Sequence, residues 1–319
     1  MGADAKHGRR EWILGLGASM LTSCGRSGCG EGAASRAVGD TAALQHLELD
    51  FDELHGGPQK AVVLIPRWGG AQERFPLLVA LHGRGESNRG LSAGAWGWAK
   101  DYRLGQTMHR MRHPPLGDED LAGLGTPAYL ADVNERIRQR PLRGLVVVCP
   151  YTPDILGTED LDAAEPFTAF VTEHLLPAVR ARCPVLGGRQ STGIDGVSLG
   201  GRVALLAAMD RPDEFRAVGS VQAAIRIGEV GGLCGRASQA WAGGRGPEAV
   251  RLLTSDEDPF AEALHKLAVA MGTASIPVHF HKVPGPHDYS FNRGPGGLEM
   301  LLWHDSVLRG EQPSVPKPG

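Results

Sequence analysis

The sequence lacks the marks of several large classes of protein. Its formal net charge is only −3 and it has no cluster of lysine and arginine, which argues against a general nucleic-acid binder with a basic stripe on its surface. Hydrophobic residues make up 42% of the chain, too large a share for a disordered protein, which combines low hydrophobicity with high net charge. No internal repeat is visible, so repeat architectures are not expected.

Glycine is the residue in excess, with 45 of the 319 positions, about twice its usual share. Collagen requires glycine at every third position, and no such period occurs here. We interpret the excess as a compact fold with many tight turns, together with a short flexible segment near the N-terminus.

The N-terminal segment has the pattern of an export signal. Lys6, Arg9 and Arg10 precede a short apolar run at 12–21, as in the charged and apolar regions of a secretory signal. The run is too short for a membrane-spanning helix, which needs about 20 apolar residues. The paired arginines also resemble a twin-arginine signal, so the export route is left open.

The apolar run is followed by Cys24 in the sequence Leu-Thr-Ser-Cys. This pattern resembles the bacterial lipobox, in which an aliphatic residue and two small residues precede the cysteine that receives lipid and becomes the new N-terminus. The sequence therefore predicts an exported bacterial lipoprotein, anchored through Cys24 on the periplasmic or cell-surface side of a membrane. An ordinary secretory signal with a chance cysteine is the alternative.

Four further cysteines follow, at Cys29, Cys149, Cys183 and Cys234. An exported protein permits disulfides, but these spacings name no pairing and lack the Cys-x-x-Cys pattern of zinc sites. Cys149 lies inside an apolar run, so we expect it to be a buried thiol.

Short apolar runs alternate with segments of helical spacing over about 260 residues, a pattern that predicts one α/β domain. Strands are expected at 47–51, 61–66, 77–81, 145–149, 191–197, 217–221, 250–254 and 277–283, and helices at 167–182, 199–210, 260–271 and 297–308. The first two strands are expected to form an antiparallel pair. The later runs lack polar alternation, which is typical of parallel strands buried on both faces.

Three regions depart from this alternation. Residues 84–144, after the third predicted strand, are too long for a simple crossover, and we expect an insertion of one or two helices plus loops. The glycine-rich stretches at 228–246 and 294–297 are interpreted as loops.

The chemistry centres on the sequence Gly-Val-Ser-Leu-Gly at 196–200. A strand candidate precedes this Gly-x-Ser-x-Gly motif and a helix candidate follows it, which is the context of a nucleophile elbow. The serine of such an elbow sits in a strained turn, so small residues are needed two positions before and after it. The hydroxyl of Ser198 would then project at a helix N-terminus, where the helix dipole favours developing negative charge.

A serine nucleophile needs a base, and the motif order serine, acid, histidine is available here. His287 lies in a glycine- and proline-rich segment between the last predicted strand and the last predicted helix, so it is the candidate base. Asp258, four residues after a strand end, is the preferred acid because a turn there can direct it at the histidine. Asp256 is the alternative acid.

The segment His82-Gly83-Arg84 follows the strand at 77–81 and is the candidate oxyanion loop. The expected donors to the oxyanion are the backbone N–H of Leu199 and that of Gly83 or Arg84. The side chain of Arg84 either faces an anionic group of the substrate or lies at the surface.

No metal and no organic cofactor is expected, because nucleophilic catalysis by serine needs neither. A zinc site formed by His279 and His281 with His287 is an alternative, but the sequence offers no second cluster of ligands for it.

These residues carry a resemblance to the esterase-D-like group of α/β-hydrolases, which includes feruloyl, acetylxylan and siderophore esterases. The matching stretches are 75–83, 196–201, 210–215, 258–260 and 285–289, within 47–308. The resemblance implies an α/β-hydrolase fold with a mostly parallel central sheet, helices on both faces and an insertion after the third strand. It also implies a triad of Ser198, Asp258 and His287 and an acyl-enzyme route.

The sequence thus predicts a serine hydrolase that cleaves a carboxylic ester of a small molecule or of a polysaccharide. Alternatives are a serine peptidase, a lactone or thioester hydrolase, and a catalytically inactive, surface-tethered binding protein. The expected organisation is a signal peptide (1–23), a flexible tether (24–43), the hydrolase domain (44–312) and a C-terminal tail (313–319). No nucleic-acid partner is expected, and contact with the membrane is expected only through the N-terminal lipid.

Overall fold

The computed structural model describes residues 43–52 and 57–317. The predicted signal peptide, the lipobox with Cys24 and almost all of the tether lie outside the described residues. In the part that is described, no helix combines the length and apolar character required to cross a membrane.

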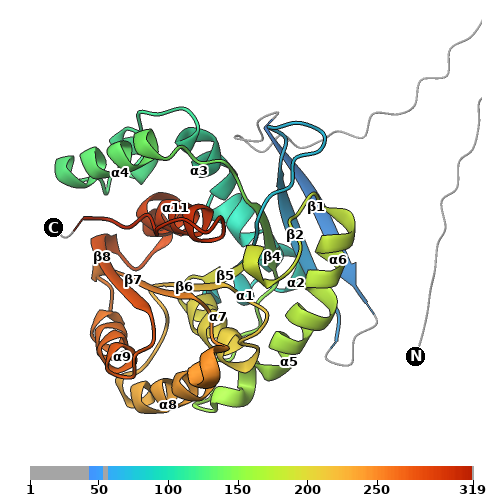
Figure 1. Cartoon of the computed structure of the whole chain (residues 1–319), viewed down its shortest axis with the longest axis vertical. Coiled ribbons are helices and arrows are strands. Elements are labelled where there is room, and N and C mark those ends of the chain that lie inside the picture. The colour runs from blue at the N-terminus through green and yellow to red at the C-terminus, as the bar shows by residue number, and fades with distance from the viewer. Residues whose placement is uncertain (1–42, 53–56, 318–319) are drawn as a thin grey trace, which may run out of the picture. The chain divides into compact units, whose positions relative to one another are not determined.

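An eight-stranded sheet forms the centre of the described domain, in the order β1-β2-β4-β3-β5-β6-β7-β8 (Figure 1). Its strands are β1 (Leu44–Phe51), β2 (Gln59–Pro66), β3 (Leu77–Leu81), β4 (Val146–Pro150), β5 (Thr192–Gly196), β6 (Ala217–Val221), β7 (Ala249–Glu257) and β8 (Val278–Pro286). β2 runs antiparallel to both β1 and β4, and the other neighbours pair in parallel. The predicted antiparallel opening pair and mostly parallel sheet are therefore correct.

The helices connect the strands and cover both faces of the sheet. The α-helices are α1 (Arg84–Ser87), α2 (Leu91–Ala95), α3 (Leu104–Met111), α4 (Pro127–Gln139), α5 (Glu165–Ala169), α6 (Leu176–Arg182), α7 (Leu199–Asp210), α8 (Val230–Trp241), α9 (Ala261–Thr273), α10 (Tyr289–Phe291) and α11 (Gly297–Val307). π-helical turns lie at η1 (Gly97–Asp101), η4 (Phe170–Leu175) and η8 (Asn292–Gly296). Short 3₁₀ turns are η2 (Asp118–Leu121), η3 (Leu161–Ala164), η5 (Arg189–Ser191), η6 (Ile227–Glu229) and η7 (Ala242–Gly244).

Two apolar layers hold these helices to the sheet. Helices α3, α4 and α11 cover one face, and α5 to α9 cover the other (Figure 1). Every residue of β3 and β4 is buried. Along β3, Leu77 and Val79 pack into one layer and Leu78 and Ala80 into the other, because successive side chains of a strand point to opposite faces. The apolar runs without polar alternation thus reflect burial on both faces.

The insertion between β3 and β4 is more helical than the sequence indicated. It contains four α-helices, α1 to α4, where one or two were expected. Helices α1 and α2 span only 4 and 5 residues, which is too short for an apolar period to be visible in the sequence.

The prediction of a loop at 228–246 is wrong, because α8 occupies most of this stretch. An added Cβ at Gly231 or Gly235 would meet nothing within 4 Å, so these glycines lie on an open face. There they reduce helix propensity by about 1 kcal/mol each. The buried side chains of Leu233, Ala237 and Ala240 face the core, and this packing outweighs the weak propensity.

The prediction of a loop at 294–297 is wrong for 294–296, which belong to the π-helical turn η8 with a kink at Gly294, whereas Gly297 begins α11 as the predicted helix at 297–308 requires. An added Cβ at Gly294 would lie 2.4 Å from the carbonyl oxygen of Leu121. Glycine is therefore required at position 294 because two backbone segments approach each other closely there. Glycine content alone does not distinguish such a close approach from a loop.

Candidate active site

Ser198 occupies a sharp turn between β5 and α7, at φ 55° and ψ −114°. A positive φ is costly for a residue with a Cβ, and the surrounding backbone holds this one in place. The Ser198 N–H donates to the carbonyl of Val221 at 2.9 Å. A Cβ at Gly196 would lie 2.4 Å from the carbonyl of Gly200, and one at Gly200 would lie 2.4 Å from that of Leu81. The glycines of the motif are therefore needed for close backbone packing.

Three polar side chains from three strand ends meet at this turn. The Nε2 atom of His287 lies 3.1 Å from Ser198 Oγ, and its Nδ1 atom lies 2.9 Å from Asp258 Oδ1. A proton on Nδ1 that is donated to the carboxylate leaves the Nε2 lone pair free to accept the serine proton. The arrangement can therefore act as a serine nucleophile with its general base.

The acid is held by further hydrogen bonds. The Asp258 side chain is fully buried, and it accepts from the Thr254 hydroxyl at 2.6 Å and from the Phe260 N–H at 3.0 Å. These donors fix both carboxylate oxygens. The ring of Phe260 packs against that of His287, with centroids 5.4 Å apart, so the imidazole is also held by an apolar contact.

The positions of the acid and the base differ in one respect from expectation. β7 extends to Glu257 and β8 to Pro286, so Asp258 and His287 directly follow strands and do not lie in loops several residues beyond them. Asp256, the alternative acid, lies on the exposed end of β7 and pairs with Lys282 at 3.1 Å. The structure thus brings Asp258, and not Asp256, to His287.

The oxyanion loop is oriented by His82, a residue to which the sequence gave no separate role. The Thr152 N–H donates to His82 Nε2 at 2.9 Å, and His82 Nδ1 lies 2.9 Å from the Gly83 carbonyl oxygen. Because a backbone N–H can only donate, Nε2 is unprotonated, and Nδ1 carries the proton and donates it to Gly83. The Gly83 carbonyl and the Arg84 N–H belong to one planar trans peptide, so this bond also fixes the direction of the Arg84 N–H.

The two alternative donors in this loop have different surroundings. The Gly83 N–H donates to the Tyr102 hydroxyl at 3.2 Å, so it is already used inside the protein. Arg84 and Leu199 are the first residues of α1 and α7, where N–H groups have no carbonyl partner within the helix. The candidate oxyanion donors are therefore the N–H groups of Leu199 and Arg84.

The Arg84 side chain lies at the surface. Its Nε atom donates to Asp154 at 2.7 Å, and 57% of the side chain is exposed. This is the surface placement that the sequence left as one of two possibilities. The ion pair joins the oxyanion loop to the loop that follows β4.

Sequence reasoning missed a buried carboxylate beside the oxyanion loop. Glu86, which is 1% exposed, accepts a hydrogen bond from Tyr102 and another from Tyr289. Glu86 and Tyr102 belong to no motif, whereas Tyr289 ends the matching stretch 285–289. The one available signal was the position of Tyr289, two residues after the candidate base.

No metal site emerges from the histidines. Both ring nitrogens of His287 face Ser198 and Asp258, and the rings of His279 and His281 stack on each other. Among the described residues, no group of three or more histidine, cysteine, aspartate or glutamate side chains is placed to hold a metal ion. The zinc alternative therefore has no geometric support.

The cysteines within the described residues are free thiols. Cys149 and Cys183 are buried and Cys234 is partly buried. Cys149 is thus the buried thiol that was expected, and burial raises the pKa of its thiol. Cys29 lies outside the described residues.

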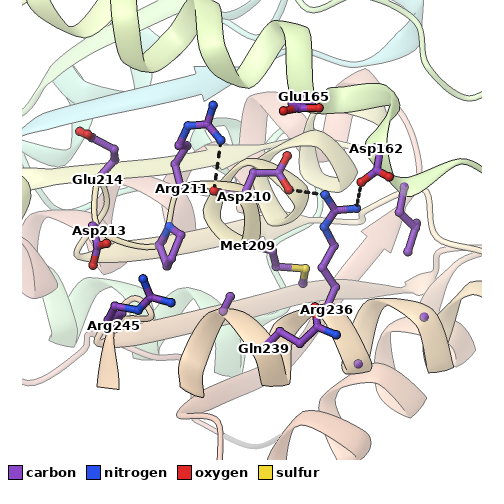
Figure 2. Close-up of a pocket in the computed structure, with 15 residues that line it drawn as sticks. Asp162, Glu165, Met209, Asp210, Arg211, Asp213, Glu214, Arg236, Gln239 and Arg245 are labelled. Carbon is purple, nitrogen blue, oxygen red and sulfur yellow. Dashed lines mark hydrogen bonds and ion pairs between the residues drawn. The ribbon is translucent and has the colours of Figure 1, made fainter. Parts of the chain in front are cut away.

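A separate groove of about 1050 Å³ lies between the C-terminal end of α7 and α8 (Figure 2). Arg236 crosses it and contacts Asp162 and Asp210 at 2.6 Å each. Residues 210–214 of the stretch 210–215, which contributed to the resemblance, form part of the lining, whereas Ser198 and His287 do not. Within this stretch, the ion pair of Asp210 with Arg236 joins the end of α7 to α8, apart from the serine.

Comparisons with known proteins bear on the fold and on the class of reaction. A family model described as "Putative esterase" matches residues 157–247, which is less than half of the chain. No curated protein matches.

Solved structures resemble most of the domain. A ferulic acid esterase superposes with a TM-score of 0.59 at 16% identity, covering 83% of this chain and 98% of that one. An S-formylglutathione hydrolase from Agrobacterium tumefaciens gives 0.57 at 16%, covering 84% and 98%. The enterobactin esterase from Shigella flexneri gives 0.55 at 19%, covering 81% and 59%.

The chain has the α/β-hydrolase fold. At these identities the structural likeness establishes the fold alone, and the match of 157–247 to an esterase model supports the predicted class of carboxylic ester hydrolase. In this fold, ligands bind beyond the carboxyl ends of the parallel strands, and Ser198, Asp258 and His287 follow the carboxyl ends of β5, β7 and β8.

The buried imidazole of His82 predicts a dependence of stability on pH. Burial lowers the pKa of His82 to about 4, whereas the unfolded chain should titrate near 6.5. Between these values the unfolded state binds a proton that the folded state does not, so stability is lost as pH falls through this window, by at most about 1.4 kcal/mol per pH unit. Above pH 6.5 this contribution is fully retained.

The measurement is urea unfolding of the wild type and of His82→Gln at pH 7, 5.5 and 4. The glutamine can still accept from the Thr152 N–H but does not titrate, so the variant should lose less stability on acidification. Because the other histidines are common to both proteins, equal losses would contradict the assignment.

Proposed function

We propose that this protein is a serine esterase that hydrolyses carboxylic esters through an acyl-enzyme. The observation that carries the proposal is the continuous hydrogen-bonded path from Asp258 through His287 to Ser198, at 2.9 and 3.1 Å. A strained turn presents the serine at the start of a helix. The esterase family match over 157–247 supports the same reaction class.

In the acylation step, Ser198 Oγ attacks the carbonyl carbon of the ester while His287 Nε2 takes the serine proton. The carbonyl oxygen becomes an oxyanion, which the N–H groups of Leu199 and Arg84 bind. Collapse of this intermediate breaks the bond to the alcohol oxygen, and His287 gives its proton to the leaving alkoxide. The products of this step are the free alcohol and an acyl group on Ser198.

In the deacylation step, His287 takes a proton from water, whose oxygen attacks the acyl carbon. The second tetrahedral intermediate expels Ser198, which recovers its proton from His287, and the carboxylic acid leaves. Asp258 keeps the imidazole in the required tautomer and stabilises the imidazolium in both steps. Each oxyanion donor contributes roughly 3–4 kcal/mol to transition-state stabilisation.

The same steps cleave a thioester, in which a thiolate leaves in place of the alkoxide. The likeness to an S-formylglutathione hydrolase supports this as the second candidate activity. A carboxylic ester on a small molecule or a polysaccharide is the first candidate because of the esterase family match and the likeness to a ferulic acid esterase.

The proposal predicts that the full chain hydrolyses short p-nitrophenyl esters and is labelled by a fluorophosphonate. Ser198→Ala should abolish labelling and lower kcat by at least about 10³-fold, because the nucleophile is lost. Asp258→Asn should lower kcat on the order of 10³–10⁴-fold, because the imidazole loses its orienting carboxylate.

Asp256→Asn is the matched control, since Asp256 is an exposed carboxylate two residues away that pairs with Lys282. This variant should retain wild-type kcat. Labelling of Ser198→Ala at the wild-type rate, or equal losses in Asp256→Asn and Asp258→Asn, would contradict the assignment.

We also propose that the protein is exported from a bacterial cell and held at a membrane by lipid on Cys24. Support comes from the sequence alone: a basic segment, the apolar run 12–21 and the lipobox-like Leu-Thr-Ser-Cys.

In a bacterial host the full chain should incorporate labelled palmitate and enter the detergent phase. Cys24→Ala should do neither, and Cys29→Ala should do both; palmitate labelling of Cys24→Ala would contradict the anchor.

A further inference from the structure

Glu86 lies in α1, directly after the oxyanion loop, and both of its carboxylate oxygens are engaged. Its Oε2 atom accepts from the Tyr102 hydroxyl, and its Oε1 atom accepts from the Tyr289 hydroxyl at 2.5 Å. Arg89 Nη2 lies 3.4 Å from Oε1. A carboxylate that is 1% exposed and bound by three donors is costly to desolvate unless every bond is made, so its partners are strongly fixed.

Tyr102 connects this carboxylate to the oxyanion loop. A tyrosine hydroxyl has one proton to donate, and Tyr102 gives it to Glu86, which leaves the oxygen to accept from the Gly83 N–H at 3.2 Å. The ring is 2% exposed and packs edge-to-face on Trp98, with centroids 4.8 Å apart. Both ends of the side chain are therefore held.

The peptides on either side of Gly83 are then fixed by two different side chains. Tyr102 holds the N–H of Gly83, and His82 holds its carbonyl oxygen. The second peptide contains the Arg84 N–H, so its direction depends on both contacts. A Cβ on Gly83 would lie 3.7 Å from the Val197 carbonyl oxygen, which places this peptide beside the nucleophile.

Tyr289 connects the same carboxylate to the segment of the candidate base. It lies two residues after His287, and its hydroxyl oxygen would be 3.0 Å from a Cβ on Gly85. Burial and the neighbouring Glu86 raise the pKa of Tyr289 to about 12, and they also raise the pKa of Tyr102 well above its usual value. Both hydroxyls therefore stay protonated, and remain donors, at neutral and moderately alkaline pH.

We propose that Tyr102, oriented by Glu86, is a positioning residue of the oxyanion hole. It holds the Gly83 N–H, and together with His82, which holds the Gly83 carbonyl, it directs the Arg84 N–H toward the reacting carbonyl. Through Tyr289 the same carboxylate joins the oxyanion loop to the segment that carries His287. The inference rests on the proposed esterase function. The orientation of the Arg84 N–H affects the rate of hydrolysis only if an oxyanion forms at this site.

The experiment compares Tyr102→Phe with Tyr129→Phe in the full chain. Tyr129 is a matched control because its buried hydroxyl donates to a buried carboxylate, Glu299, at 2.8 Å, between α4 and α11. Each variant loses one hydroxyl and keeps its ring. Thermal unfolding, kcat and KM for a p-nitrophenyl ester, and the rate of fluorophosphonate labelling are measured for both.

Tyr102→Phe should lower kcat and the labelling rate by roughly tenfold or more, because a small displacement of a reacting geometry has a large effect on rate. Its KM should stay within about twofold, since the ground-state ester does not need the oxyanion donors. Tyr129→Phe should lower the unfolding temperature comparably and leave kcat and the labelling rate at wild-type values. This split separates positioning from a general loss of stability.

Glu86→Gln provides a second variant if Tyr102→Phe does not fold. Its amide retains one acceptor oxygen in place of two, so kcat should fall while KM is kept. Wild-type kcat in either folded variant, or an equal loss of kcat in Tyr129→Phe, would overturn the inference while the proposed function stands. A wild-type chain without Ser198-dependent labelling would overturn the proposed function, and this inference with it.

Discussion

The site depends on one steric constraint, the direct packing of two backbone segments without room for a Cβ. The elbow that carries Ser198 lies against the end of β3 so closely that a Cβ on Gly200 would approach the carbonyl oxygens of Leu81 and His82 to 2.4 and 2.6 Å. This contact brings the start of α7 beside the start of α1. The two helix N-termini can therefore present N–H groups to one oxygen atom. Side chains between the two segments would keep these N–H groups too far apart to do so.

Buried hydrogen bonds complete what the backbone packing begins. His82 fixes the Gly83 carbonyl, Asp258 orients His287, and Glu86 holds two tyrosines against the same loops. His82, Asp258 and Glu86 are buried with their partners in place, and an unpaired polar group there would cost about 1–3 kcal/mol. Preorganisation of the site thus follows from the cost of breaking these bonds.

The sequence predicts the reacting residues and much of the fold, because apolar runs and short motifs determine these parts locally. The apolar runs of β3 and β6 and the helix α7 have the expected bounds, and Gly-x-Ser-x-Gly requires a strand before it and a helix after it. Helix α8 was missed because its packing, and not its glycine-rich sequence, stabilises it. Glu86 and Tyr102 were missed because their contacts join residues 16 apart within the insertion, where no spacing rule applies.

The central claim is that Ser198 carries the acyl group of the substrate between two chemical steps. The most direct test mixes the full chain with p-nitrophenyl acetate, stops the reaction with acid within milliseconds, and locates the acetyl group by mass spectrometry of the peptides. We expect an acetyl ester on Ser198 that accumulates when deacylation is the slower step and that is absent from Ser198→Ala. Turnover of the ester by a wild-type chain with the acetyl group on another residue would contradict it.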